Sequence, residues 1–520
     1  MTYRPTVRSA NGIVASGHHL ATAAGLAAQR DGGSAVDAAI AAAAVCAVVL
    51  PNRCAIGGDV FALVYDARTQ QVTAYNGSGA APAAVDEMAF VHGFGDHGVR
   101  LATVPGAVAA WGDLLNDHGK LGIDRALAAA ISYAAEGFPV SDMLSLAIGE
   151  EADRLGADPS AARTYSPLGR RPRPGEMLQQ PELAGSLRAI AADGADVFYR
   201  GELAQRIAAG IASLGGWVGS DDLAAHQTDR RAPIETSYRG LRVVGQPPVS
   251  QGHVLLEELA IAEGLDLRSM GWGSAEQVHT MVEIKKLAFA DRDATAGDPR
   301  MVRFGAEELF SERYAAQRRR SIGAKASDRV EPAALPADTT YLAVVDRDGN
   351  AVSFIESVFS AFGAATIVPG TGILLNNRLS GFSLDPRSPN AIAPGKRPIH
   401  TLNTVIVLDG QSPRFVYGTP GRHAQVQTNF QIAVGLIDHE LDVQEAIEAP
   451  RWYHASGRTV QVEGRFPEQV RKGLAAKGHD VQVLGDWAEI TGGVQAIAID
   501  GNGVFSGGAD PRREGYAAGY

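Results

Sequence analysis

Thr339 stands where a threonine could act as a nucleophile. It opens an alternating apolar run that ends at Asp346, and the turn at 347–350 leads into a second such run. A threonine hydroxyl is a poor nucleophile unless a base adjoins it. A cut between Asp338 and Thr339 would free an α-amine on the same residue, and its ordinary pKa of about 8 suits a base near neutral pH. Taken alone, the same residues also suit an ordinary strand and hairpin turn.

The segment before Thr339 has the composition of a cleavable connection. Residues 311–338 include three consecutive arginines at 318–320, and prolines at 332 and 336. Exposed, weakly packed segments of this kind tolerate chain cleavage. The local pattern therefore permits a cut before the threonine.

The composition is that of an acidic globular chain. Its 520 residues include 47 Lys or Arg and 58 Asp or Glu, a formal net charge of −11. Because there is no basic run, we expect no nucleic-acid partner, and the acidic surface argues against anionic membranes. No His/Asp/Glu cluster stands out with metal-ligand spacing, so we expect neither a metal nor another cofactor.

Two further patterns bear on the location of the protein. The N-terminal residues contain no apolar signal region, which favours a cytoplasmic enzyme. The longest apolar stretch, 35–50, is interrupted by Asp37 and is too short for a membrane span, so it predicts a buried helix. Cys46 and Cys54 are too few for a disulfide framework.

The hydrophobic periodicity predicts how these residues are positioned. Residues 107–310 are mostly helical by period, and the charged segment 283–286 suits an exposed helix face. Strands are predicted at 340–346, 351–357, 403–408 and 414–418, followed by helices near 424–438 and 443–449. Short strands with helices grouped elsewhere suggest a layered α/β protein, which a four-layer αββα sandwich would satisfy.

Several short strings share an order that is typical of one family. They are GGSAVDAAIA (32–41), IGG (56–58), VPG (104–106), EIKKLAFADRDATAGDP (283–299), TTY (339–341), DGNAV (348–352), GILLNN (372–377), KRP (396–398), GTPG (418–421) and ADPR (509–512). In these strings the chain resembles the γ-glutamyltranspeptidase family of N-terminal-nucleophile (Ntn) hydrolases. The resemblance implies a precursor that cuts itself before Thr339. A large subunit, 1–338, and a small subunit, 339–520, would stay intertwined in one αββα domain, and we leave open whether the pair forms a homodimer.

The resemblance also implies catalytic partners for Thr339. Ser357 stands where the family has a second threonine that hydrogen-bonds the nucleophile, so a hydroxyl is retained. The string around Gly421 aligns with the turn that forms the oxyanion hole, whose donors here would be the N–H groups of Gly421 and Arg422.

The residues that bind a γ-glutamyl group in the family are altered. Ser78 stands at the position of the arginine that pairs with the α-carboxylate. Gly381 replaces the aspartate that pairs with the α-ammonium, and Phe359 replaces an asparagine. Because an unpaired charge in a closed site is costly, a zwitterionic head fits poorly.

The remaining polar residues suggest a simpler substrate. Candidate substrate-binding residues are Arg378, His400, Thr401, Asn377 and Arg53. They suit a small amide that carries a carboxylate and no ammonium group, of which oxamate is the smallest. In this respect the chain is similar to the oxamate amidohydrolase branch of the family.

Three alternatives remain open at this point. One is a glutathione hydrolase or γ-glutamyltransferase with a rearranged pocket, and another is a glutaryl-type cephalosporin acylase. A third is a processed scaffold with a degenerate site. The Thr339-Thr340 pair and the hydroxyl of Ser357 argue against the scaffold.

Overall fold

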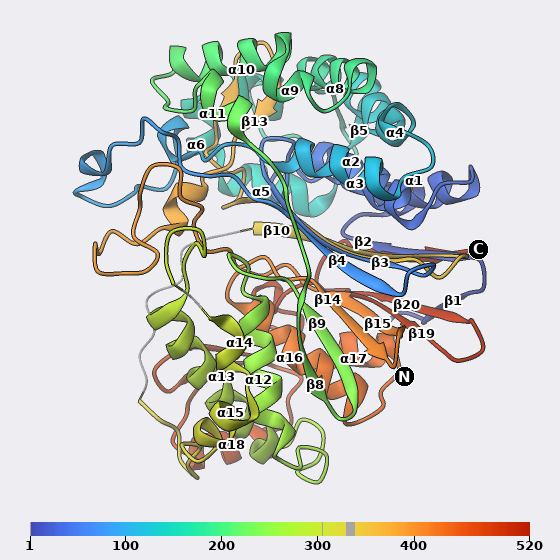
Figure 1. The fold of residues 1–520 in the computed structure, drawn as a ribbon, viewed down its shortest axis with the longest axis vertical. Helices are drawn as coiled ribbons and strands as arrows, with labels where there is room; N and C mark the ends of the chain where they lie inside the picture. The colour runs from blue at the N-terminus through green and yellow to red at the C-terminus, as the bar shows by residue number, and fades with distance from the viewer. Residues whose placement is uncertain (1, 304, 329–337) are drawn as a thin grey trace.

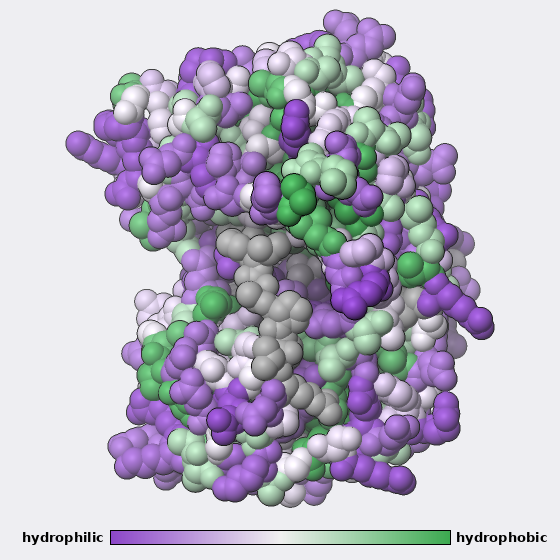
Figure 2. Space-filling model, turned by 90° about the vertical axis from the view of Figure 1, so that its left-hand side faces the viewer, coloured by the Kyte–Doolittle hydropathy of each residue, from purple (hydrophilic) through white to green (hydrophobic). Residues whose placement is uncertain are grey.

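Two seven-stranded antiparallel sheets are stacked face to face between two layers of helices (Figure 1). The structure is a computed structural model and describes residues 2–303, 305–328 and 338–520, without the side chain of Asp338. On the face drawn in Figure 2 the surface is largely hydrophilic and is indented between the two helical layers. The four-layer αββα sandwich predicted from the sequence is confirmed.

The first sheet, sheet I, contains the strand that starts at the predicted cleavage point. Its order is β21 (Tyr516–Gly519), β2 (Gly12–Ser16), β10 (Asp338–Asp346), β11 (Ala351–Phe359), β3 (Asp59–Asp66), β4 (Gln71–Gly77) and β7 (Asp229–Arg231). β10 is therefore a central strand, bonded to β2 on one side and β11 on the other.

The second sheet, sheet II, draws mainly on the C-terminal part of the chain. Its order is β1 (Val7–Ser9), β20 (Phe505–Ala509), β19 (Gln495–Ile499), β15 (Ser412–Gly418), β14 (Val405–Asp409), β9 (Leu241–Gly245) and β8 (Ile234–Tyr238). Smaller sheets are formed by β5 (Phe138–Pro139) with β6 (Met177–Leu178), by β12 (Ile367–Val368) with β13 (Ile373–Leu374), and by β16 (Trp452–Ser456), β17 (Thr459–Glu463) and β18 (Asp480–Leu484).

The helices divide between the two outer faces. Those that cover sheet I are α1 (His19–Arg30), α2 (Ala35–Val49), α3 (Ala107–His118), α4 (Ile123–Glu136), α5 (Asp142–Glu150), α6 (Ala152–Ala157), α7 (Pro159–Tyr165), α8 (Pro181–Asp193), α9 (Val197–Arg200), α10 (Glu202–Ser213) and α11 (Ser220–Ala225). Those on the side of sheet II are α12 (Gly252–Glu263), α13 (Ala275–Thr295), α14 (Ala306–Leu309), α15 (Glu312–Arg319), α16 (Ala424–Ile437), α17 (Val443–Glu448) and α18 (Glu468–Ala476).

A third apolar core lies between the sheets, where alternate side chains such as Tyr341, Ala343 and Val345 face Val244, Ile406 and Val416.

The apolar stretch at 35–50 forms α2, and every residue of that helix is buried, as predicted. Ser34 caps it by accepting from the Asp37 N–H, while the Asp37 carboxylate accepts from the Ser34 N–H. Such a reciprocal box satisfies two donors that a helix start otherwise leaves unpaired. No helix within residues 2–303, 305–328 and 338–520 is long and apolar enough to cross a membrane.

The prediction of an exposed charged face at 283–286 is wrong. Glu283, Lys285 and Lys286 are buried in α13, which packs against α12 and α18. Their charges have partners inside the fold: Lys286 pairs with Glu283 at 2.8 Å, one turn away on the same helix, and Lys285 Nζ lies 2.9 Å from His454 Nδ1, a tertiary contact. Buried charges persist when they are paired in this way.

Candidate active site

Thr339 lies near the start of β10, buried between the helical layers. Its Oγ1 donates to the Oγ of Ser357 on the neighbouring strand β11 at 3.2 Å. Ser357 Oγ in turn accepts the Phe359 N–H at 2.9 Å. The pairing of β10 with β11 shifts between Asp338 and Thr340, so the backbone is irregular at the predicted cut.

The turn that follows β15 carries the two predicted oxyanion donors, Gly421 and Arg422. Gly421 and Arg422 have φ of 129° and 60°, and they precede α16. Glycine at position 418 permits the turn to start against sheet I, because a Cβ there would lie 2.4 Å from the ring of Tyr341. Thr419 fixes the turn by accepting the Gly493 N–H at 2.8 Å. Gly421 and Arg422 border a cavity of about 320 Å³.

Arg378 is held in a buried ion pair. Its Nε donates to Asp59 Oδ2 at 2.9 Å, and neither side chain is exposed. The guanidinium lies over the ring of Phe359, 4.6 Å from its centroid. Asp59 is the register partner of Ser357, so this pair sits beside the strand that carries the threonine's hydrogen-bond acceptor.

The other edge of that guanidinium has unused hydrogen-bond donors. Nη1 and Nη2 of Arg378 are buried without a hydrogen-bond partner among the described residues. Burial lowers the pKa of Arg378 and raises that of Asp59, because each charge has left water, although each opposes the shift of the other. An arginine in a protein nevertheless stays protonated, so Nη1 and Nη2 are charged donors that no described residue satisfies.

His400 adds a neutral polar group to the same region. Its ring meets Phe61 edge-on with centroids 5.0 Å apart, and both ring nitrogens lack a partner in the described part of the chain. Burial, together with the charges of Arg378 and Arg397, holds the pKa of His400 well below 6.5. The imidazole is thus neutral near pH 7 and offers one donor and one acceptor. We call Asp59, Phe359, Arg378 and His400 the Arg378 cluster.

The other predicted binding residues lie in different settings. Asn377 Oδ1 accepts the Ser360 N–H and its Nδ2 donates to Ser360 Oγ, both at 3.0 Å, so it secures the loop after β11. Arg53 Nη2 pairs with Glu489 at 3.0 Å and lines the 320 Å³ cavity with Gly421. Thr401 is partly exposed beside His400.

Comparison with known proteins decides the family. The family model described as Gamma-glutamyltranspeptidase matches residues 21–520. The chain belongs to the γ-glutamyltranspeptidase family. This family member is accordingly an Ntn-type enzyme that acts on amide bonds.

Individual relatives cover nearly the whole chain. The Glutathione hydrolase-like YwrD proenzyme of Bacillus subtilis (strain 168) is 40% identical, over 98% of this chain and 98% of its own length. The Oxamate amidohydrolase proenzyme of Klebsiella pneumoniae is 37% identical, over 98% of this chain and 99% of its own. A solved cephalosporin acylase from Bacillus halodurans superposes with a TM-score of 0.95 at 38% identity, covering 100% of this chain and 98% of that one.

Two buried carboxylates of this γ-glutamyltranspeptidase family member, Asp59 and Glu356, were not predicted as site residues. Asp59 directly follows the IGG string and begins the otherwise apolar strand β3. A carboxylate at the start of such a strand could have indicated a functional residue. Glu356 is a lone acid in the apolar strand β11, fully buried opposite Thr340, and burial raises its pKa well above 4.5.

The expectation that no His/Asp/Glu cluster has ligand spacing is also wrong. The structure brings His279, Glu283 and His479 together, with one potential ligand atom from each within 4.8 Å of the others. His279 and Glu283 are four residues apart on α13, a spacing that places two side chains on one helix face. His479 joins them from the other half of the sequence, which periodicity does not reveal.

Proposed function

We propose that this protein is a self-processing amidohydrolase that cuts its own Asp338–Thr339 bond. Thr339 Oγ1 adds to the carbonyl carbon of Asp338, and the amide nitrogen of Thr339 leaves as the new α-amine. Water then hydrolyses the ester, which gives chains 1–338 and 339–520. The position of Thr339 Oγ1 against Ser357 supports this step, and the relatives named above as proenzymes are consistent with it.

After the cut, the same oxygen attacks substrate. The α-amine of Thr339 takes the proton from Oγ1, the oxygen adds to the amide carbonyl, and the proton passes to the leaving amine. The N–H groups of Gly421 and Arg422 would stabilise the oxyanion, a role that follows from the family to which the chain belongs, in which this turn forms the oxyanion hole. Water releases the acid from the acyl-enzyme and restores the free threonine.

The observation that carries the substrate proposal is that Nη1 and Nη2 of Arg378 have no partner among the described residues. Two buried donors without a described partner match the two oxygens of a carboxylate. Asp59 is already engaged by Arg378 Nε and by the Gly79 N–H, and Gly381 has no side chain to meet an ammonium group. The substrate we propose is a small amide with a carboxylate and no ammonium, such as oxamate, which would give oxalate and ammonia.

A second candidate shares the same recognition group. A glutaryl amide also carries a carboxylate without an ammonium, so Arg378 would suit its terminal carboxylate. The likeness to a cephalosporin acylase and 35% identity to the Acylase ACY 1 proenzyme of Pseudomonas sp. (strain SE83) favour this alternative. The two candidates differ in the distance between carboxylate and scissile amide.

Two measurements test the proposal. On a denaturing gel the wild type should give two bands of about two thirds and one third of the chain, whereas Thr339→Ala should give one band and no amidase activity. Ammonia release from oxamate is then compared with anilide release from glutaryl and γ-glutamyl anilides. Cleavage and turnover that persist in Thr339→Ala would refute the mechanism, and efficient γ-glutamyl transfer to Gly-Gly without oxamate turnover would refute the substrate class.

A further inference from the structure

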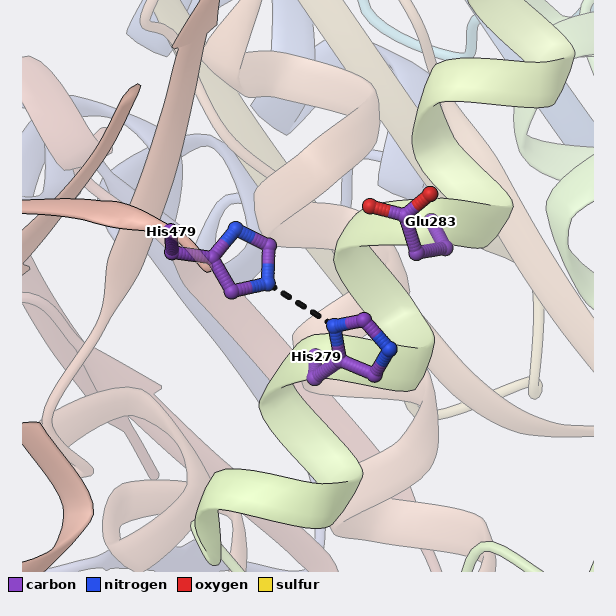
Figure 3. Close-up of side chains that lie close together, drawn as sticks. All are labelled: His279, Glu283 and His479. Carbon is purple, nitrogen blue, oxygen red and sulfur yellow. Dashed lines mark hydrogen bonds between the residues drawn. The ribbon is translucent and has the colours of Figure 1, made fainter. Parts of the chain in front are cut away.

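The buried cluster of His279, Glu283 and His479 has no part in the proposed chemistry. His279 and Glu283 project from one face of α13, and His479 reaches them from the residue before β18 (Figure 3). His279 Nδ1 and His479 Nε2 face each other at 2.8 Å. All three residues are at least 95% buried, so their polar groups cannot rely on solvent for hydrogen bonds.

The two imidazoles are oriented as paired metal ligands. His279 Nε2 lies 2.9 Å from the Gly323 carbonyl, which fixes the proton on that nitrogen and leaves Nδ1 with its lone pair toward His479. Metal-bound histidines commonly hold their remote N–H on a backbone carbonyl in this manner. In a tetrahedral site two zinc–nitrogen bonds of about 2.0–2.1 Å hold the nitrogens about 3.3–3.4 Å apart, so the two rings would rotate outward by about half an ångström from their present 2.8 Å to admit the ion.

The contact between the two imidazoles requires a proton on one of the facing nitrogens. His279 Nε2 donates its own proton to the Gly323 carbonyl, so the proton between the rings belongs to His479 Nε2. Ligation would displace that proton.

One carboxylate oxygen of Glu283 can accept a further partner. Its Oε1 accepts from Lys286 Nζ at 2.8 Å and from the Ser327 N–H at 3.2 Å. Among the residues that the structure describes, Oε2 has one longer contact of 3.3 Å with the same N–H, and a carboxylate oxygen can accept a second partner. The ammonium of Lys286 opposes a dication, but it is shared with the Ser327 carbonyl and offset by the Glu283 charge.

We propose that His279, Glu283 and His479 bind a zinc ion, with water at the fourth position. Two imidazoles and one carboxylate form a donor set that zinc accepts and that calcium or magnesium, which prefer oxygen, do not. His279 and Glu283 precede Thr339 in the chain, and His479 follows it. The ion would therefore connect the two products of the cut, a consequence that rests on the proposed processing, whereas the site itself needs only the folded chain.

Metal analysis of the full-length protein tests the site. Protein is incubated with Zn²⁺, passed through a desalting column with a weak chelator, and analysed for metal. Wild type should retain about one zinc per chain, and His279→Ala and His479→Ala should retain less than about a tenth of that. The matched control is His439→Ala, because His439 also bonds to α13, through Gln277 at 2.7 Å, yet lies outside the cluster.

A second readout does not depend on the variants folding. A strong chelator should lower the Tm of wild type by about 2–4 °C, with recovery on adding Zn²⁺ but not Mg²⁺. Thr339→Ala should bind zinc equally well, so failed processing and a failed metal site give different results. Wild type that retains no zinc, or retention that His279→Ala and His479→Ala leave unchanged, would overturn the proposal.

Discussion

Arg378 donates its Nε–H to Asp59 across 2.9 Å, and both side chains are wholly buried. The pair holds the guanidinium over Phe359 and leaves Nη1 and Nη2 without a partner among the described residues. Removing one member of such a pair leaves an uncompensated buried charge, at a cost of about 3–5 kcal/mol. The effect of replacing either residue alone must therefore be compared with that of a double variant in which both charges are removed.

Arg378→Lys should raise the KM for oxamate about 10–100-fold with a small change in kcat. Lysine keeps the charge but loses the two-pronged geometry, and charge-assisted hydrogen bonds contribute about 1.5–3 kcal/mol. Steady-state ammonia release measures the effect. The double variant Arg378→Met/Asp59→Asn should remain folded and cut itself, yet lose oxamate binding. An unchanged KM in both proteins would contradict a role of Arg378 in substrate binding.

Ser357→Ala should slow both self-cleavage and turnover by about fivefold, because the variant removes a hydrogen bond worth about 1 kcal/mol from Thr339 Oγ1. Ser357→Thr keeps a hydroxyl at the same atom and should retain most of both rates. Band appearance over time and initial amidase rates report the two steps. Equal rates in the alanine and threonine variants would remove Ser357 from the mechanism.

Gly421→Ala should reduce turnover by about 10²–10³-fold, the usual effect of losing one oxyanion donor. Its φ of 129° disfavours a side chain, and a new Cβ would lie 3.1 Å from Gly492 Cα. Gly93→Ala is the control, because Gly93 has a φ of 101° with nothing within 4 Å of the added Cβ. Wild-type kcat in Gly421→Ala would show that the turn does not contact the transition state.

Glu257→Gln should flatten the pH dependence of stability. Glu257 is buried in α12 with both carboxylate oxygens lacking a described partner, and burial raises its pKa to about 8. Glu258 adds to this shift and Arg318 opposes it. A raised folded-state pKa means that the protonated form of Glu257 favours folding. The contribution of Glu257 to the free energy of unfolding is therefore fully present below about pH 4.5. It is lost as the pH rises to about 8, by roughly 3–5 kcal/mol.

Thermal unfolding of wild type and Glu257→Gln at several pH values between 5 and 8 checks this. The Tm of wild type should fall more steeply with rising pH than that of the variant. Parallel curves would mean that Glu257 does not titrate between these limits.

Much of the fold was predictable because alternation and apolar runs are local signals. The strands β10, β11, β14 and β15 and the helices α16 and α17 begin and end within two residues of their predicted limits. The charged segment of α13 was mispredicted because its partners are distant in sequence. His454, which meets Lys285, lies 169 residues away, and no periodicity indicates that contact.

The candidate site was predictable to a similar depth. Thr339, Ser357 and Gly421 followed from the order of family strings, and the contact of Thr339 with Ser357 requires only that β10 pair with β11. Asp59 was missed because it meets Arg378 across 319 residues. That pairing depends on how β3 docks in sheet I, which is set by tertiary packing rather than by any short pattern.

The strand order has a consequence for the two fragments that the proposed cut would produce. In sheet I, β2 from the first segment lies between β21 and β10 from the second, and in sheet II β1 borders β20 while β9 borders β14. Neither fragment contains all the strands of either sheet, so dissociation of the fragments would break several strand pairs at once. Dilution should leave the nicked molecule whole, and fragments of two differently labelled preparations should not mix until both are denatured.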